Sequence, residues 1–400
     1  MMDREKGVLD DLKNELVSEF MGHVIPFWQG LSDKEYGGFY GLLDDQLNLD
    51  KKADKGAILN SRILWFFSSA YTFFEEESLL YTAREAYHEL KNCFYDNEKG
   101  GVYWSVTYDG NPSDDSKHTY NQAFAIYGLA SYYEAAGDSE ALDMALELFN
   151  VIESNCCDDI GYLEAFSREF EPVSNEKLAD NNGTTGARTM NTLLHVMEAY
   201  TELYRVNENP KVKEKLLRIL KVFREKVYDP EGEKLYVFFD MDYNSTADIH
   251  SYGHDIEATW LIDRTIDVLD LRGSEYDLSD ITDKLTKKIY DIAYDGSVAE
   301  ENRFGTVSET RVWWVECEAM IGFMNAYQKD QSETKYLDAI RSIWDFIVTY
   351  IVDKREGSEW YFQVDKDGKP IPGWAIASLW KCPYHNGRMF IEMIKRMESL

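Results

Sequence analysis

The segment YGGFYGLLDD (36–45) recurs in altered form five more times along the chain, as KGGVYWSVTYDG (99–110), DIGYLEAFSREF (159–170), EGEKLYVFFDMD (231–242), DGSVAEENRFG (295–305) and EGSEWYFQVDKDG (356–368). The copies are 63, 60, 71, 64 and 61 residues apart when they are aligned on Gly38, Gly101, Gly161, Gly232, Gly296 and Gly357. Glycine provides a turn, and alternating aromatic residues are typical of short, half-buried strands. The chain is therefore built from six repeats of about 64 residues.

Between these segments the apolar residues return at helical spacing, as in Leu142, Ala145, Leu146, Phe149 and Ile152. Two helices fit between successive turns, which predicts about twelve helices in six pairs. We expect an all-α fold in which six helical hairpins close into an (α/α)6 barrel, with short β-hairpins in the connecting loops. An open helical solenoid is the alternative. Although 400 residues suggest two to three domains by length alone, the repeat predicts a single domain over residues 1–400.

The composition restricts the partners. The chain carries 42 basic and 73 acidic residues, so its net charge is −31. Such a surface repels nucleic acid and anionic lipid, and we expect neither as a partner. A small neutral molecule fits better, and an aromatic content of 14% is compatible with stacking on sugar rings. We expect a monomer.

The cysteine usage and the N-terminal sequence point to the cytoplasm. The five cysteines form no CxxC motif, which is typical of a reducing compartment. The sequence MMDREKGVLDDLKNEL (1–16) has no apolar core of a signal peptide, and the longest apolar run, residues 63–74, is too short to span a bilayer.

Polar residues interrupt the helices that are expected to follow the first three turns. Arg62 lies within the apolar sequence GAILNSRILWFFSSAYTFF (56–74), where a charge must be paired or face a polar cavity. Tyr120 begins the next such helix. In RTMNTLLHVMEAY (188–200), Asn191 and His195 are four residues apart and share one face.

The remaining three helices continue this pattern. His254 and Glu257 share a face in SYGHDIEATWLID (251–263), and Trp314 and Glu318 share one in ETRVWWVECEAMIG (309–322). GWAIASLWKCPYHNGRMF (373–390) holds Trp380 and His385. Three of the seven histidines thus occupy comparable positions of repeat-related helices, and a closed barrel would bring them to one central cavity.

Three kinds of chemistry are open to this set of residues. His254 and Glu257 could ligate a metal, but no dense ligand motif is present and Arg62 would oppose a cation. Glu257 and Glu318 could serve a glycosidase, which needs two carboxylates. Two histidines could instead act as base and acid on opposite faces of one carbon. NNGTTGART (181–189) lacks the GK[ST] of a phosphate loop and is expected to be a turn before a helix.

The stretches GGFYG, LNSRILWFFS, RTMNTLLHVMEAYTELYR, HDIEATWL, RVWWVECEA and WKCPYHNGR resemble the cellobiose 2-epimerases of the N-acylglucosamine 2-epimerase superfamily. The resemblance extends from about residue 8 to 395 and includes the Asn-x3-His, His-x2-Glu and Trp-x4-His spacings. It implies an (α/α)6 barrel and cofactor-independent epimerisation at C2 of the reducing-end glucose in β-1,4-linked disaccharides. Cellobiose would become glucosylmannose, and lactose would become epilactose.

The resemblance also implies roles for the catalytic residues. His254 and His385 would be the acid/base pair at C2, and His195 would assist ring opening or hold the open-chain sugar. Arg62 would stabilise the enediolate oxygen. Glu257 would orient His254, and Glu318 would be a further required carboxylate.

The remaining matched residues would bind the substrate. Asn191 would bind the oxygens around C1 and C2 together with Arg62, whereas Tyr120, Trp260, Trp314 and Trp380 would shape the sugar site or stack on the sugar. No metal and no cofactor are expected. N-acylglucosamine 2-epimerases and mannose isomerases of the same superfamily are the alternatives, followed by an (α/α)6 oligosaccharide hydrolase and a sugar-binding barrel without activity.

Overall fold

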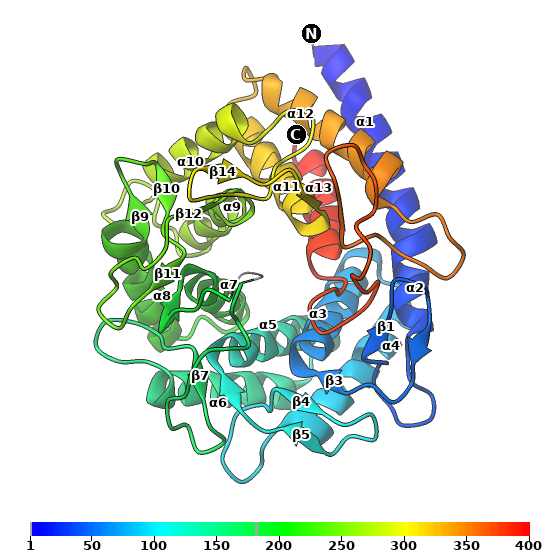
Figure 1. The fold of residues 1–400 in the computed structure, drawn as a ribbon, viewed down its shortest axis with the longest axis vertical. Helices are drawn as coiled ribbons and strands as arrows, with labels where there is room; N and C mark the ends of the chain where they lie inside the picture. The colour runs from blue at the N-terminus through cyan, green and yellow to red at the C-terminus, as the bar shows by residue number, and fades with distance from the viewer. Residues whose placement is uncertain (1, 181–182) are drawn as a thin grey trace.

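The computed structural model describes residues 2–180 and 183–400, and in them the helices form two concentric rings (Figure 1). The inner ring consists of α3 (Ala57–Phe74), α5 (Thr119–Ala136), α7 (Met190–Asn207), α9 (Tyr252–Val268), α11 (Trp313–Lys329) and α13 (His385–Glu398). The outer ring consists of α1 (Met2–Glu19), continued by α2 (Ile25–Gly30), and of α4 (Glu77–Glu89), α6 (Ser139–Asn155), α8 (Pro210–Val222), α10 (Ser279–Ile292) and α12 (Lys335–Phe346). This is the predicted (α/α)6 barrel.

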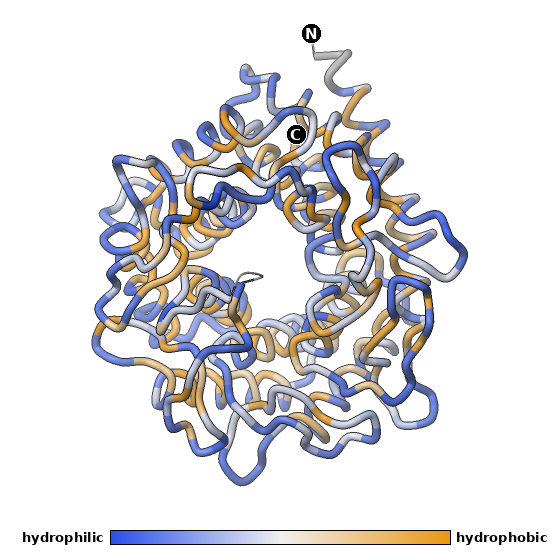
Figure 2. The backbone as a smooth tube through the Cα atoms, viewed as in Figure 1, coloured by the Kyte–Doolittle hydropathy of each residue, from blue (hydrophilic) through white to orange (hydrophobic). Residues whose placement is uncertain are grey.

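The two rings differ in their hydrophobic pattern because they differ in burial. In α5, every residue from Thr119 to Tyr132 is buried, as expected for a helix that is covered on all sides. In α8, burial is limited to a stripe formed by Val212, Leu216, Ile219 and Leu220. Figure 2 shows hydrophobic residues along the helices around the whole ring and hydrophilic residues in the loops at its rim.

Neighbouring inner helices pack closely, and the ring closes on itself. A Cβ atom at Gly128 of α5 would lie 2.7 Å from the backbone oxygen of Ser61 in α3, so this contact requires glycine. The last inner helix, α13, packs against both α3 and α1. Phe390 of α13 stacks on Phe20, with ring centroids 4.9 Å apart. The alternative of an open solenoid is therefore wrong.

Short antiparallel strands connect neighbouring repeats at one end of the barrel. The strands are β1 (Leu42–Leu43), β2 (Leu49–Asp50), β3 (Lys55–Gly56), β4 (Ser105–Val106), β5 (Pro112–Asp114), β6 (Lys117–His118), β7 (Ala165–Phe166), β8 (Arg188–Thr189), β9 (Tyr228–Asp229), β10 (Lys234–Leu235), β11 (Phe238–Phe239), β12 (Ile249–Ser251), β13 (Glu301–Arg303), β14 (Thr306–Val307), β15 (Arg311–Val312) and β16 (Gln363–Val364).

The strand pairing extends beyond the predicted hairpins. Each strand that precedes α3, α5, α7, α9 or α11 pairs with a strand of the next repeat, in the pairs β3–β4, β6–β7, β8–β11, β12–β13 and β15–β16. A bridge between Leu43 and Ala377 joins the last repeat to the first. The strands thus form a belt around the end of the barrel at which the inner helices begin.

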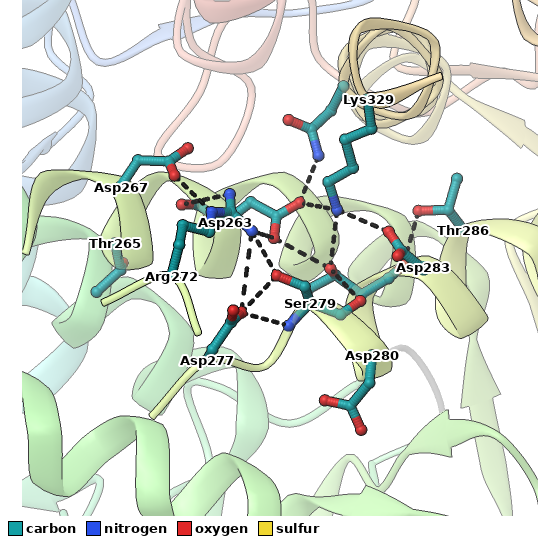
Figure 3. A network of polar contacts seen from close by, with 12 residues as sticks. Asp263, Thr265, Asp267, Arg272, Asp277, Ser279, Asp280, Asp283, Thr286 and Lys329 are labelled. Atoms are coloured by element: carbon teal, nitrogen blue, oxygen red, sulfur yellow. Dashed lines mark hydrogen bonds and ion pairs between the residues drawn. The ribbon is translucent and has the colours of Figure 1, made fainter. Parts of the chain in front are cut away.

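A polar network at the opposite end joins three helices (Figure 3). Asp263 of α9 accepts hydrogen bonds from Arg272 in the following loop, Thr282 of α10 and Asn325 of α11, and it forms an ion pair of 2.5 Å with Lys329 of α11. No helix in the described part of the chain is both long and apolar enough to cross a membrane. In the stretch 181–189, Asn181 and Asn182 lie outside the described residues, and α7 begins directly after the stretch.

A basic residue stands two positions before each of the first five inner helices, namely Lys55, Lys117, Arg188, His250 and Arg311. Four of them pair with an aspartate of a turn, in the pairs Lys55–Asp33, Lys117–Asp96, Arg188–Asp158 and Arg311–Asp295. His250 of β12 instead contacts Asp255 of α9, the helix that follows it, at 2.7 Å. The four pairs with aspartates attach the turn segments to the starts of the inner helices.

Replacing Lys55 by Met is expected to lower the free energy of unfolding by about 3–5 kcal/mol, because it leaves two buried carboxylates without their cation. Lys55 Nζ lies 3.2 Å from Asp33 and 3.4 Å from Glu89, and it donates to the Gly37 carbonyl at 2.6 Å. Chemical denaturation measures the loss, with the exposed Lys52→Met as the control. Equal stability of the two variants would contradict a structural role for the buried pair.

Candidate active site

A cavity of about 610 Å³ opens where the inner helices begin. Its walls are formed by Arg62, Tyr120, Asn191, His195, His254, Glu257, Trp313, Trp314, Phe362, Trp380 and His385. The structure thus brings together nine of the eleven residues that the sequence proposes for the site; the other two, Glu318 and Trp260, lie beneath it.

The helical register explains this convergence. Arg62, His195 and Glu257 each occupy the sixth position of their inner helix, and Tyr120 and Asn191 each occupy the second. Residues four apart on a helix share a face, so both positions point to the barrel axis. Because the helices also begin at this end, the positive ends of their dipoles favour negative charge in the cavity.

His385 is held by a carboxylate. Its Nδ1 atom lies 2.8 Å from Glu318 Oε1, which can only accept a hydrogen bond when it is ionised. The Nδ1 atom therefore carries the proton, and Nε2 is the nitrogen that can accept one. Burial lowers the pKa of His385 well below its ordinary value, and the nearby guanidinium of Arg388 lowers it further. The imidazole is thus neutral, and its Nε2 atom can accept a proton.

His254 is held by a hydroxyl group. Its Nδ1 atom lies 2.7 Å from Ser251 Oγ, and burial lowers its pKa to about 3. The Trp314 ring packs between the two histidines, with centroids 4.8 Å from His254 and 5.4 Å from His385. The expectation that Glu257 orients His254 is wrong, because the hydroxyl group of Ser251 holds the His254 ring instead.

Glu257 faces His195 instead. Its Oε1 atom lies 4.0 Å from His195 Nε2 and accepts a hydrogen bond from Arg388. Burial and the neighbouring Glu318 raise the pKa of Glu257 to about 7. His195 Nδ1 lies 2.9 Å from Glu198 Oε2. The carboxyl group of Glu257 therefore titrates near neutral pH beside His195.

Arg62 is buried beside aromatic rings. Its Nη2 atom donates to the Tyr120 hydroxyl at 2.7 Å, and its Nη1 atom lies 3.5 Å from Cys382 Sγ. The guanidinium carbon lies 4.1 Å from the Phe124 ring centroid and 4.5 Å from that of Tyr384. Within residues 2–180 and 183–400, no carboxylate forms an ion pair with Arg62. This cation is available to a negatively charged group in the cavity.

A second arginine binds three carboxylates beneath the cavity. Arg388 Nη1 donates to Glu198 at 2.5 Å, and Nη2 donates to Glu318 at 2.6 Å and also to Glu257. All four side chains are buried. Burial would raise the pKa of Glu198, but the positive charge of Arg388 and the contacts with His195 and Tyr384 together outweigh it and lower this pKa to about 2. Arg388 is thus the centre of a charged layer that supports the site.

Trp260 belongs to this charged layer and does not line the cavity, so the expectation that it shapes the sugar site is wrong. Its Nε1 atom donates to Glu318 at 3.0 Å, and its ring centroid lies 4.8 Å from the Arg388 guanidinium. The physical reason is its place on α9: Trp260 lies three residues beyond Glu257 and therefore almost one turn further from the mouth. Glu318 acts on the site through His385.

A cation does not fit among the acidic residues. Ligand atoms of Glu257, Glu318 and His385 lie within 4.8 Å of one another, which is close enough for a metal. However, Arg388 donates to the Oε1 atoms of both carboxylates, so its guanidinium already occupies the position between them. A metal ion there would face a fixed positive charge.

A second chamber of about 830 Å³ adjoins the cavity and shares Asn191, His254, Phe362 and Trp380 with it. Its wall is largely apolar and includes Val237, Phe238 and Trp374. Trp374 stacks on Phe362 with ring centroids 4.4 Å apart. The two chambers together form a site with a polar inner part and an aromatic outer part.

Four polar atoms at the inner cavity are buried without a hydrogen-bond partner in the described part of the chain: Arg62 Nε, Asn191 Oδ1, Glu257 Oε2 and Trp313 Nε1. Such atoms are rare in folded proteins because each costs free energy. Their concentration at one cavity indicates a ligand with several hydroxyl groups.

Sequence reasoning missed Arg388, Glu198 and Ser251. Each stands three residues from a candidate histidine, namely His385, His195 and His254 respectively. The spacing that places two residues on one helix face was therefore a usable signal for the first two. Trp313 was also missed, because its neighbour Trp314 has the same residue type and only the structure shows that both reach the cavity.

Comparisons with known proteins agree with the cavity. The sequence pattern of N-acylglucosamine 2-epimerase (GlcNAc 2-epimerase) matches residues 38–385. A cellobiose 2-epimerase of Ruminococcus albus is 50% identical over 384 residues, which cover 96% of this chain and 98% of that protein. These matches define a carbohydrate epimerase, which is an isomerase. The chain belongs to the N-acylglucosamine 2-epimerase family, as the sequence resemblance implied.

Solved structures support the same assignment. A sugar epimerase from a ruminal bacterium superposes with a TM-score of 0.94 at 49% identity, covering 96% of this chain and 99% of that one. The cellobiose 2-epimerase from Bacillus thermoamylovorans B4167 gives a TM-score of 0.93 at 44% identity, covering 97% of this chain and 100% of that one.

Proposed function

We propose that the protein is a cellobiose 2-epimerase, which reversibly converts cellobiose to glucosylmannose and lactose to epilactose. The observation that carries this proposal is the pair His254 and His385, two histidines with lowered pKa values at one cavity that also contains Arg62. Proton removal and return at a carbon next to a carbonyl group requires two such groups and a stabiliser of the enediolate. The outer chamber then holds the second sugar.

The reaction begins with ring opening of the reducing-end sugar. In this step His195 and Glu257 move the proton between O1 and the ring oxygen, since the carboxyl group of Glu257 titrates near neutral pH. Asn191 and Tyr120 bind hydroxyl groups of the open chain, and Trp314 and Trp380 contact its apolar faces.

Epimerisation follows at C2. One imidazole accepts the C2 proton, and the electron pair left behind forms an enediolate whose charge is stabilised by Arg62. The second imidazole, in its protonated form, donates a proton to the opposite face of C2. Because both imidazoles are neutral in the resting enzyme, the second one takes up this proton from the solvent before the transfer, and its low pKa makes the protonated form a strong acid toward C2. Neither step needs a cofactor.

The geometry disfavours a hydrolase. A glycosidase needs two carboxyl groups that flank the scissile bond. Glu257 and Glu318 accept hydrogen bonds from the same Arg388 nitrogen, and Glu318 does not line the cavity. Both carboxyl groups therefore lie on one side of any bound sugar.

Replacing Ser251 by Ala is expected to lower kcat about tenfold and to leave KM nearly unchanged, because second partners of a functional histidine fix its orientation. Steady-state kinetics on cellobiose measure the effect. Ser251→Thr keeps the hydroxyl group and should restore most of the turnover. A Ser251→Ala variant with full kcat would show that His254 does not depend on this hydrogen bond.

A panel of substrates tests the proposed function. Purified protein is incubated without added metal with cellobiose, lactose, N-acetylglucosamine or mannose, and the products are separated by chromatography. We expect glucosylmannose and epilactose from the disaccharides. Release of free glucose from cellobiose would support a hydrolase. If only N-acetylglucosamine or mannose is converted, the substrate is a monosaccharide and the proposed disaccharide activity is wrong.

We also propose that the chain acts as a single-domain, cytoplasmic monomer without nucleic-acid or membrane partners. The net charge of −31 and the five free cysteines support this proposal. Sedimentation equilibrium should give the mass of one chain, 46.5 kDa. A dimer mass would contradict the monomer.

A further inference from the structure

Among residues 2–180 and 183–400, no carboxylate is a counter-ion for the charge of Arg62. A buried cation usually has an acidic partner, because the cost of removing it from water is otherwise too large. The groups that face Arg62 are the hydroxyls of Tyr120 and Tyr384, the Cys382 thiol, the Phe124 ring and His385. None of them is a carboxylate, and burial raises the pKa of Tyr120 to about 12, so its hydroxyl stays neutral.

The acidic residues nearest the cavity pair with another arginine. Glu198, Glu257 and Glu318 all accept hydrogen bonds from Arg388 in the layer beneath. None of these three carboxylates forms an ion pair with Arg62, and the two C2 histidines are neutral in the resting enzyme, so the guanidinium is open to an anion at its own position in the cavity. Such a site is suited to a ligand with one negative charge close to the position of the sugar C1 and C2 atoms.

The enediolate carries this charge only briefly, whereas an aldonic acid carries it permanently. In an aldobionate the reducing-end sugar is an open chain with a carboxylate at C1, and its glycosidic link to the second sugar is unchanged. The carboxylate can accept two parallel hydrogen bonds from a guanidinium, which is the strongest common pairing of these groups. The outer chamber would hold the second sugar as it does in the substrate.

We propose that the site binds aldobionates, with the carboxylate on Arg62, and that these sugar acids are inhibitors of the enzyme. The proposal rests on the proposed function, because it uses the same disaccharide site. The net charge of −31 opposes the approach of an anion, but physiological salt limits this repulsion to about 8 Å. The contact with Arg62 in the cavity is shielded from that salt.

Isothermal titration calorimetry with two open-chain ligands tests the proposal. Cellobionate and cellobiitol have the same length and the same glucosyl group, and they differ only in the carboxylate or alcohol at C1. At pH 7.5 we expect cellobionate to bind the wild-type protein at least about tenfold more tightly, since a hydrogen bond to a charged group contributes more than one between neutral groups. Cellobionate should also compete with cellobiose in the epimerase assay.

The variant Arg62→Gln should reduce the affinity ratio of the two ligands to about one. Arg62→Lys keeps the charge without the bidentate geometry and should give an intermediate ratio. If the wild-type protein binds cellobionate no more tightly than cellobiitol, the inference is overturned, whether or not the variants fold. An affinity ratio of the two ligands that stays at the wild-type value in a folded Arg62→Gln protein would also overturn it. If cellobiitol also fails to bind, the proposed disaccharide site itself is wrong.

Discussion

Replacing His385 by Ala is expected to lower kcat for epimerisation of cellobiose by about 10²–10⁴-fold, the usual contribution of a general acid or base. The imidazole lines the cavity, and Glu318 holds its Nδ1 atom at 2.8 Å. Removing it takes away one of the two groups that exchange a proton with C2. KM should change little, because aromatic side chains and Asn191 supply most of the binding contacts.

The exposed His88 provides the matched control. His88→Ala should retain full activity, and circular dichroism should show that both variants are folded. Near-normal turnover of a folded His385→Ala protein would remove this residue from the mechanism. His254→Ala should fail in epimerisation to a similar degree. Each single variant keeps one base and should therefore still exchange the C2 proton of only one epimer, which identifies the face that each histidine serves.

Replacing Arg388 by Met is expected to lower the free energy of unfolding by at least about 3–5 kcal/mol, because it leaves buried carboxylates without their cation. Three glutamates depend on this one guanidinium, namely Glu198, Glu257 and Glu318. Activity should also be lost, since Glu318 and Glu198 hold His385 and His195. Chemical denaturation and kinetics measure the two effects.

Arg341→Met is the control for the loss of an arginine. Arg341 is partly exposed and pairs with Glu15 and Asp345 at the surface, so its loss should cost less than about 1 kcal/mol. Arg388→Lys keeps the charge but not the fork of donors, and it should lie between the wild type and Arg388→Met. A loss in Arg388→Met as small as in Arg341→Met would contradict the account of the charged layer.

The ring of helices could be predicted from the sequence because its signal is local. The glycine turns recur at nearly constant spacing, and the apolar residues between them follow the helical period. The belt of strands could not be predicted in the same way. Gly56 pairs with Ser105, and Arg188 pairs with Phe239, so each partner lies about 50 residues away and outside any local pattern.

Part of the wall of the cavity was also predictable, because Arg62, His195 and Glu257 at the sixth position of their inner helices converge once the ring closes. His254 and His385 are the third and the first residue of their helices and do not follow this register. The contacts between these residues could not be predicted from the sequence. Glu257 shares a helix face with His254, yet its carboxyl group turns to His195 and Arg388, and Ser251 holds His254 instead. Spacing determines which side chains share a face, but packing and charge in the closed barrel determine which of them pair.

The central claim is proton transfer at C2 by groups of the protein, and the most direct test is a proton NMR time course of cellobiose in D2O with the purified enzyme and no added metal. The account predicts a growing reducing-end signal of the mannose type in which deuterium has replaced the proton at C2. Conversion to the epimer with complete retention of the C2 proton, or no change in cellobiose at all, would contradict it.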